Sequence, residues 1–303
     1  MLPAFLYLSF VADPVAHKDG VKSVDFSPSG KMIASGGWDS RLKVWDVNGK
    51  LINKLQGPAN NSVTGVSWSP DGNTVATSWS DGKVRLFSPI LRKGTVVFST
   101  GTSYASGIKY AADGKSLYVS GYDNLVKKMS LTGTVLTRFK GLPSDAYCMD
   151  LSGRAVLGGG PDACVVWQLA RPITSKKVVM KGNIGDVQFI NDGRSFAAVS
   201  LGTSVKVFNS TTGEEEGSYE NNQVWTARFS ADSKRVVTGD RTGGVRLFNY
   251  PGFEDEKVLL ESGPGIAAIS WNKAGTSVVT GDDDGHLVLW DAGTGAKRRA
   301  FGE

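Results

Sequence analysis

Residues 17–46 read HKDGVKSVDFSPSGKMIASGGWDSRLKVWD. Within this stretch, runs of apolar and β-branched residues alternate with turns that are rich in glycine, serine and aspartate. One run ends at Phe26, a turn follows at Ser27–Gly30, and a later run ends at Trp45. Glycine takes positive φ without steric cost, and a nearby serine or aspartate bonds the turn backbone, so such turns are typical of hairpins. The stretch therefore predicts consecutive antiparallel strands.

The same unit recurs along the whole chain. An aromatic residue or methionine that precedes a turn returns every 39 to 42 residues, and we call these residues the anchors. The anchors are Phe26, Trp68, Tyr110, Met149, Phe189, Phe229 and Trp271. Repetition at about 40–45 residues indicates the blades of a propeller. The sequence thus predicts a single all-β domain over residues 1–303, a seven-bladed β-propeller of four-stranded antiparallel blades.

Polar residues at fixed offsets carry a resemblance to the WD40 repeat family. The set is His17, Ser35, Asp39 and Trp45 in the first unit, Thr77 and Asp81 in the second, and Thr280, Asp284 and Trp290 in the last. The resemblance implies that such residues form a hydrogen-bonded network that braces a blade. A buried carboxylate needs satisfied partners, so a network of this kind is physically sensible. The middle units lack most of these residues, and we expect apolar packing to hold them.

Both ends of the chain contain strand-like segments, Phe5–Val11 and Lys297–Phe301. We expect the ring to close by pairing of the N- and C-terminal strands, although the sequence leaves open which segment completes the last blade. The apolar N-terminus lacks the basic start and the cleavage site of a secretory signal, so a cytoplasmic location is expected, with the nucleus as the alternative. Cys148 and Cys164 are expected to be reduced thiols, and a bridge between them stays open.

The sequence contains no recognisable catalytic constellation. Gly114-Lys-Ser116 lacks the earlier glycine of a phosphate loop, and Asp282–Asp284 lacks the spacing of a calcium loop. The chain has two histidines and no CxxC pair, which gives no support for a metal site. No apolar run reaches the length of a membrane span. We therefore expect no enzymatic activity, no cofactor, no metal, no membrane partner and no small-molecule substrate.

A partner surface is expected where the loop before each innermost strand meets the turn between the second and third strands. These segments lie at one end of every blade and would ring the mouth of the central channel. The candidate residues are Lys22, Trp38, Tyr104, Tyr122, Asp145, Gln223, Trp225, Arg241 and Asp283. Trp, Tyr and Arg dominate interface hot spots, although the sequence leaves open that some of these side chains are tucked between blades.

These observations favour a non-enzymatic scaffold that binds a protein or peptide partner at the channel mouth, as a subunit of a larger complex. The net charge of +5 leaves an alternative open, an RNA- or ribonucleoprotein-associated propeller that uses basic and aromatic surface residues. The resemblance identifies no subfamily, and the sequence names no partner.

Overall fold

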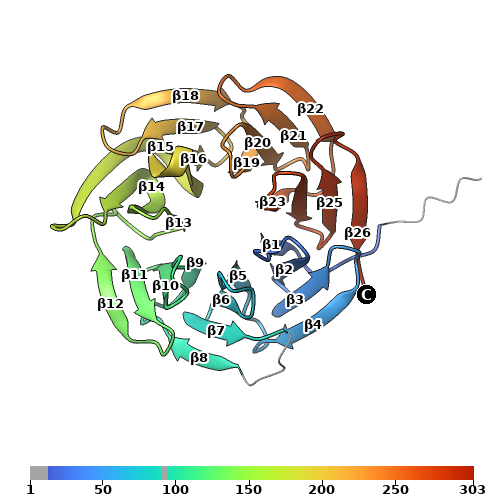
Figure 1. The fold of residues 1–303 in the computed structure, drawn as a ribbon, viewed down its shortest axis with the longest axis horizontal. Coiled ribbons are helices and arrows are strands. Elements are labelled where there is room, and N and C mark those ends of the chain that lie inside the picture. The colour runs from blue at the N-terminus through green and yellow to red at the C-terminus, as the bar shows by residue number, and fades with distance from the viewer. Residues whose placement is uncertain (1–12, 90–94) are drawn as a thin grey trace, which may run out of the picture.

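The computed structural model describes residues 13–89 and 95–303, and in these residues the strands form a ring around a central channel (Figure 1). The first three sheets run in chain order around the ring. They are β1 (Val21–Phe26), β2 (Met32–Gly37), β3 (Arg41–Asp46) and β4 (Leu51–Gln56); β5 (Val63–Trp68), β6 (Val75–Trp79), β7 (Lys83–Phe87) and β8 (Val96–Ser99); and β9 (Ala105–Tyr110), β10 (Ser116–Gly121), β11 (Leu125–Ser130) and β12 (Val135–Phe139).

The remaining strands continue the ring. The next sheet holds β13 (Cys148–Leu151), β14 (Ala155–Gln168), β15 (Thr174–Ile190), β16 (Ser195–Ser200), β17 (Ser204–Asn209) and β18 (Glu215–Glu220). Two sheets follow, β19 (Val224–Phe229), β20 (Arg235–Asp240), β21 (Val245–Asn249) and β22 (Glu254–Leu260), then β23 (Ile266–Trp271), β24 (Ser277–Asp282), β25 (Leu287–Asp291) and β26 (Lys297–Phe301). A 3₁₀ turn at Asn191–Gly193 is the helical element of the described residues, and none of their helices is long and apolar enough to cross a membrane.

The prediction of seven four-stranded blades is wrong. The described strands form six sheets, five with four strands and one with six. The cause is β15, which pairs with β14 as far as Asn183 and with β16 from Ile184 onward. Elsewhere a polar connection such as Gly57–Ser62 separates one unit from the next, whereas β15 passes through Gly182 without leaving the ladder. The fourth and fifth repeat units therefore share one continuous sheet.

The predicted closure by pairing of N- and C-terminal strands stays a prediction, because its N-terminal segment is not among the described residues. Among the described residues, the last sheet is completed by β26, which pairs with β25 from Leu287↔Phe301 onward. The segment Phe5–Val11 lies outside the described residues. The first and last sheets are joined in other ways: the amides of Ala16 and His17 donate to Gly285 O, each at 3.0 Å.

The core lies between neighbouring sheets. Each strand of the inner and middle positions buries apolar side chains on both faces, as expected for a sheet that is covered on two sides. At the junction of the first and last sheets, Trp45 meets Phe301 edge to face, with 5.9 Å between ring centroids. Both rings are fully buried, and an aromatic pair of this kind adds about 0.5–1.5 kcal/mol beyond its burial. Packing of this sort makes the ring a rigid support for side chains at its ends.

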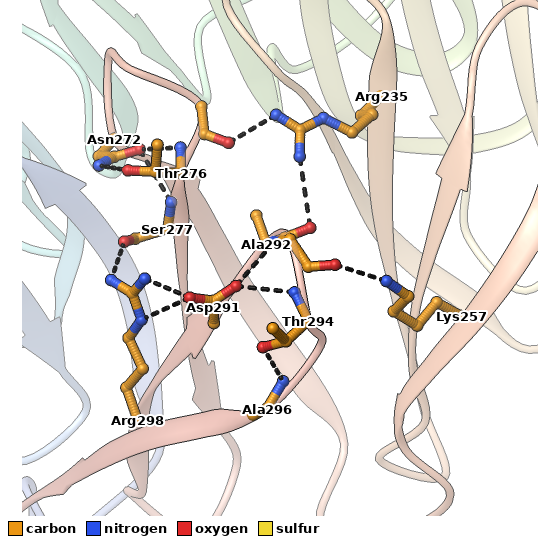
Figure 2. Close-up of polar contacts among 12 residues, drawn as sticks. Arg235, Lys257, Asn272, Thr276, Ser277, Asp291, Ala292, Thr294, Ala296 and Arg298 are labelled. Atoms are coloured by element: carbon orange, nitrogen blue, oxygen red, sulfur yellow. Dashed lines mark hydrogen bonds and ion pairs between the residues drawn. The ribbon is translucent and has the colours of Figure 1, made fainter.

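Polar contacts reinforce the junction between the last two sheets at the end opposite the predicted mouth (Figure 2). Arg235 of β20 donates to Gly275 O at 2.6 Å and to Ala292 O at 3.3 Å, and Lys257 of β22 donates to Gly293 O at 2.6 Å. Within the last sheet, Asp291 accepts from the Thr294 amide at 2.7 Å and pairs with Arg298. These basic side chains are therefore engaged in holding the ring together.

Candidate partner-binding surface at the channel mouth

The channel is a cavity of about 660 Å³ between the innermost strands β1, β5, β9, β13, β15, β19 and β23. The six-stranded sheet contributes two of these strands, β13 and β15. The wall of this cavity carries both charged and aromatic side chains. These groups are available to a ligand only where they do not already form hydrogen bonds or ion pairs with one another.

One polar position recurs on the innermost strands, directly before the anchor in every unit but the fourth, where it directly follows Met149. It holds Asp25, Ser67, Lys109, Asp150, Gln188, Arg228 and Ser270. Asp25 accepts a hydrogen bond from the Trp68 amide at 2.9 Å, and Ser67 accepts one from the Tyr110 amide at 3.0 Å. Asp150 and Gln188 do the same for the amides of Phe189 and Phe229, each at 2.8 Å. These four side chains therefore bond their own units to the backbone of the next unit.

We call these seven residues the polar belt. Its two cations are paired inside the channel. Lys109 lies 3.6 Å from Asp150, and Arg228 pairs with Asp186, which also accepts a 2.7 Å bond from the Thr226 hydroxyl. Burial alone would lower the pKa of Arg228, but Asp186 and Asp150 outweigh it and the pKa is raised. Burial raises the pKa of Asp25. This set was not predicted from the sequence, although one of its members stands directly before six of the seven anchors.

The two segments predicted to meet at the mouth do meet, through backbone hydrogen bonds. The amides of Trp38, Tyr122, Arg241 and Asp283 donate to the carbonyls of Gly20, Tyr104, Gln223 and Gly265, at 2.9–3.0 Å. Four of the predicted residues, Lys22, Tyr104, Tyr122 and Trp225, line the cavity itself. Trp38, Asp145, Gln223, Arg241 and Asp283 come from the same loops but are not among its lining residues.

Three tyrosines gather on one side of the mouth. Tyr104 stacks on Tyr122 with 4.5 Å between ring centroids, and Tyr147 lies 5.7 Å from Tyr122 in a tilted arrangement. Tyr122 keeps 42% of its surface exposed. Burial raises the pKa of Tyr122, and the neighbouring Tyr147 and Asp145 raise it further. The cluster thus presents aromatic surface that no strand covers.

Tyr147 was missed by the sequence analysis because the fourth unit is shifted by two residues. Asp150 bonds the next unit as Asp25 does, so Leu151, not Met149, stands in the anchor position. A usable signal was Ser152, whose hydroxyl accepts the Ala155 amide at 3.0 Å as Ser27 accepts the Met32 amide at 3.0 Å. In this register Tyr147 stands where Lys22 stands in the first unit.

The other side of the mouth carries charge. The Arg241 guanidinium lies 5.1 Å from the centroid of the Trp225 ring, a cation–π geometry. Gln223 accepts a 2.8 Å bond from the Thr242 hydroxyl, and Trp38 leaves half of its surface exposed. Burial raises the pKa of Asp283, Lys22 and Arg241 lower it, and Asp282 and Asp284 raise it further.

The bracing network of the first unit is complete. His17 contacts Asp39 through Nδ1 at 2.9 Å and Ser35 through Nε2 at 2.8 Å, and the Trp45 indole donates to Ser35 Oγ at 3.0 Å. Burial tends to raise the pKa of Asp39, but the hydrogen bond and charge of His17 outweigh it, and the pKa is lowered.

The other units vary this network. In the second unit the Trp79 indole donates to Thr77 at 2.7 Å, and Asp81 pairs with Arg85 at 2.7 Å. In the last unit Trp290 donates to Thr280 at 2.9 Å. There the carboxylate that binds a histidine is Asp282, which lies 2.9 Å from His286, whereas Asp284 is exposed.

Groups suited to metal chemistry are not assembled in the described residues, where no three His, Cys, Asp or Glu side chains could share an ion. Cys148 and Cys164 are buried and unbridged. Burial raises the pKa of Cys164 to about 12, and the pKa of Cys148 is also raised.

The repeat pattern and the ring agree with a comparison of the sequence against known families. The model of the WD domain, G-beta repeat, matches residues 9–46, 49–88 and 257–291. The chain carries WD40 repeats. Propellers of WD40 repeats are typically non-enzymatic scaffolds that present a rigid surface to other proteins.

Several known proteins are similar in sequence to parts of this chain. Telomerase protein component 1 of Mus musculus is 30% identical over 36% of this chain, which is 4% of that protein. The SIR4-interacting protein SIF2 of Saccharomyces cerevisiae is 31% identical over 26% of the chain, and the F-box-like/WD repeat-containing protein TBL1X of Mus musculus is 38% identical over 27%. The matched region is 15% of each of the latter two. The chain therefore spans a small part of these relatives.

Proposed function

We propose that this WD40 propeller is a non-enzymatic scaffold that docks a protein or peptide segment on its channel-mouth face, as a subunit of a larger complex. The observation that carries the proposal is the aromatic surface at the mouth. Tyr104, Tyr122 and Tyr147 contact one another and line an open cavity, and Trp225 lines the same cavity beneath Arg241. Large, stiff rings bring contact area at low entropic cost.

Stability does not require these rings at the mouth. The equivalent places in the second unit hold Ser62 and Thr64, and Thr64 is satisfied by a 2.5 Å bond to Ala105 O. A small hydroxyl residue therefore suffices at this position of a blade. The aromatic side chains are better explained by something that they contact outside the chain. The names of two relatives, a SIR4-interacting protein and a telomerase protein component, support a role in assemblies.

The test is affinity purification from cells of the chain with Trp225→Ala and Arg241→Ala together, followed by mass spectrometry. We expect the double variant to lose partners that the wild-type chain retains, because it removes two hot-spot side chains. Leu136→Ala is the matched control, since Leu136 is 53% exposed on β12 away from the mouth. Circular dichroism must show both variants folded. Recovery of the same partners by the folded double variant would remove this face from contention.

RNA binding is the alternative that the same experiment separates. Several basic side chains outside the mouth are engaged in the ring: Arg298 pairs with Asp291, Lys297 contacts Asp13, and Lys257 binds Gly293 O. Binding through phosphates weakens steeply with salt because counterions are released. Retention of bound species at high salt supports protein docking, and loss of nuclease-sensitive species at high salt supports RNA. The proposal places the protein in the cytoplasm, where its two thiols would stay reduced.

A further inference from the structure

Lys22 is the channel-wall lysine at the mouth, and it differs from the other half-buried cations of the wall. Lys109 and Arg228 are each paired with an aspartate. Among residues 13–89 and 95–303, no carboxylate lies within ion-pair distance of the Lys22 ammonium and no acceptor bonds it. Burial lowers the pKa of Lys22, and the more distant Asp283 and Asp186 offset this in part. A half-buried ammonium without a partner costs stability.

In the two units that follow, the position equivalent to Lys22 holds a hydroxyl that bonds the neighbouring unit. Four residues before the anchors, the second and third units hold Thr64 and Ser106. These donate to the carbonyls of Ala105 and Ala146 at 2.5 Å and so stitch one unit to the next. Lysine at this place in the first unit makes no such bond. Its charge is therefore not explained by the assembly of the ring.

Lys22 belongs to the cavity that also contains the aromatic side chains. Trp225, with Arg241 above it, and the three tyrosines line or border the same mouth. The charges of Lys22 and Arg241 both act on Asp283 and lower its pKa, whereas burial raises it. A carboxylate brought in by a partner would interact with both cations, and Asp283 is the acid with which it would compete for them.

We infer that the mouth binds a segment of a partner protein that presents an aspartate or glutamate to Lys22 and Arg241 and an apolar or aromatic side chain to Tyr104, Tyr122 and Tyr147. This inference rests on the proposed docking function and adds the chemistry of the partner. The geometry that carries it is an unpaired, half-buried lysine that lines the same cavity as an aromatic cluster. Charge-assisted hydrogen bonds to a carboxylate are stronger than neutral ones, particularly where water is partly excluded.

The experiment uses an array of random twelve-residue peptides with blocked ends, so that Asp and Glu side chains are their only anions. The whole chain is applied as wild type, Lys22→Met, Asp283→Asn and Lys115→Met. Methionine keeps an apolar stem of similar length and removes the charge. Lys115 is the matched control because it is an exposed lysine in the turn before β10, at the opposite end of the ring. The best peptides are then titrated in solution by fluorescence polarisation.

The expected result is enrichment of Asp or Glu next to an aromatic or aliphatic residue. Lys22→Met should weaken the enriched peptides at least about tenfold, as expected for loss of one partner of a desolvated charge pair, and Lys115→Met should leave them unchanged. Asp283→Asn should tighten them, because it removes the acid that competes for Lys22 and Arg241. Replacing the peptide Glu by Gln should reproduce the loss caused by Lys22→Met.

Enrichment of Lys or Arg, weaker binding by Asp283→Asn, or acidic peptides that ignore Lys22→Met would each overturn the inference. So would an array without signal, or binding of a twelve-residue uridine RNA in the absence of peptide binding. A Tyr104→Ala, Tyr122→Ala double variant separates this failure from failure of the docking proposal. If that variant loses peptides that Lys22→Met retains, the face binds peptides and only the assigned charge is wrong.

Discussion

Ser35 is the side chain on which the bracing network of the first blade depends, and Ser35→Ala tests the network directly. Its hydroxyl is fully buried and has two partners, the Trp45 indole at 3.0 Å and His17 Nε2 at 2.8 Å. The indole can only donate, so Ser35 Oγ accepts from Trp45. The Asp39 carboxylate accepts, so His17 Nδ1 carries a proton and donates it to Asp39, and in the neutral imidazole Nε2 then accepts the Ser35 hydroxyl proton.

Ser35→Ala leaves the Trp45 N–H and His17 Nε2 without partners in a buried site. Each unsatisfied buried group costs about 1–3 kcal/mol, so for the two groups we expect a loss of about 2–6 kcal/mol in the free energy of unfolding. In a domain of 150–250 residues 1 kcal/mol lowers the melting temperature by roughly 2–4 °C, so Tm of this larger chain should fall by several degrees. Urea denaturation followed by tryptophan fluorescence measures the first quantity, and thermal circular dichroism measures the second.

Two companion variants make the test specific. Ser29→Ala is the control, because Ser29 is exposed and its hydroxyl contacts the Ser27 hydroxyl in a turn, and we expect a change within about 0.5 kcal/mol. Trp45→Phe removes the indole N–H. Its cost should be about 1 kcal/mol smaller in the Ser35→Ala background, where that donor is already unpaired. A loss below about 0.5 kcal/mol for Ser35→Ala, or strictly additive costs, would refute the reasoning.

Three further predictions concern other parts of the ring. Gln188→Leu removes the acceptor of the Phe229 amide and the donor to Phe229 O, and we expect urea denaturation to show a loss of about 2 kcal/mol in the free energy of unfolding. An unchanged midpoint would mean that the polar belt does not hold neighbouring units together. Hydrogen bonds from Lys43 and Lys54 lower the pKa of Glu303 from 4.5 to about 2, so the contribution of Glu303 to stability is complete above about pH 4.5 and is lost as pH falls through about 2. The stability advantage of wild type over Glu303→Gln should therefore shrink across that window, and a constant difference would contradict the pairing. Burial raises the pKa of Cys164 to about 12, so a thiol reagent at pH 8 should react with neither cysteine in the folded chain and with both in denaturant; rapid modification without denaturant would show that the sites open.

The sequence predicted the repeating unit well because the unit is defined by local chemistry. Turns such as Ser27–Gly30 need glycine at positive φ, and Gly30 has φ 68°. The mouth was likewise predictable, since fixed offsets from each anchor bring Trp38 to Gly20 and Tyr122 to Tyr104. Spacing alone therefore located the end of the ring where aromatic side chains gather.

What the sequence did not predict depends on contacts between units. The number of sheets follows from whether β15 leaves the ladder near Gly182, and a backbone bend of that kind has no distinct residue pattern. The two-residue shift in the fourth unit hid Tyr147, because Met149 resembles an anchor, whereas the bond from the Phe189 amide to Asp150 and the turn serine Ser152 fix the register. The polar belt was missed for the same reason, since its bonding partners lie a whole repeat away.

Comparison of equivalent positions separates residues that the ring needs from residues that it merely tolerates. Where a position bonds the next unit, as Asp25 and Ser67 do, its polarity is explained by assembly and says nothing about a ligand. The position four residues before the anchor carries a hydroxyl in Thr64 and an unbonded ammonium in Lys22. Assembly of the ring explains the hydroxyl but not the ammonium. An unsatisfied charge at such a site lowers stability, so its presence is best accounted for by a partner that satisfies it. Equivalent positions of one chain provide this contrast without any relative. For this reason we infer that the partner contacts Lys22 and not the more numerous exposed lysines.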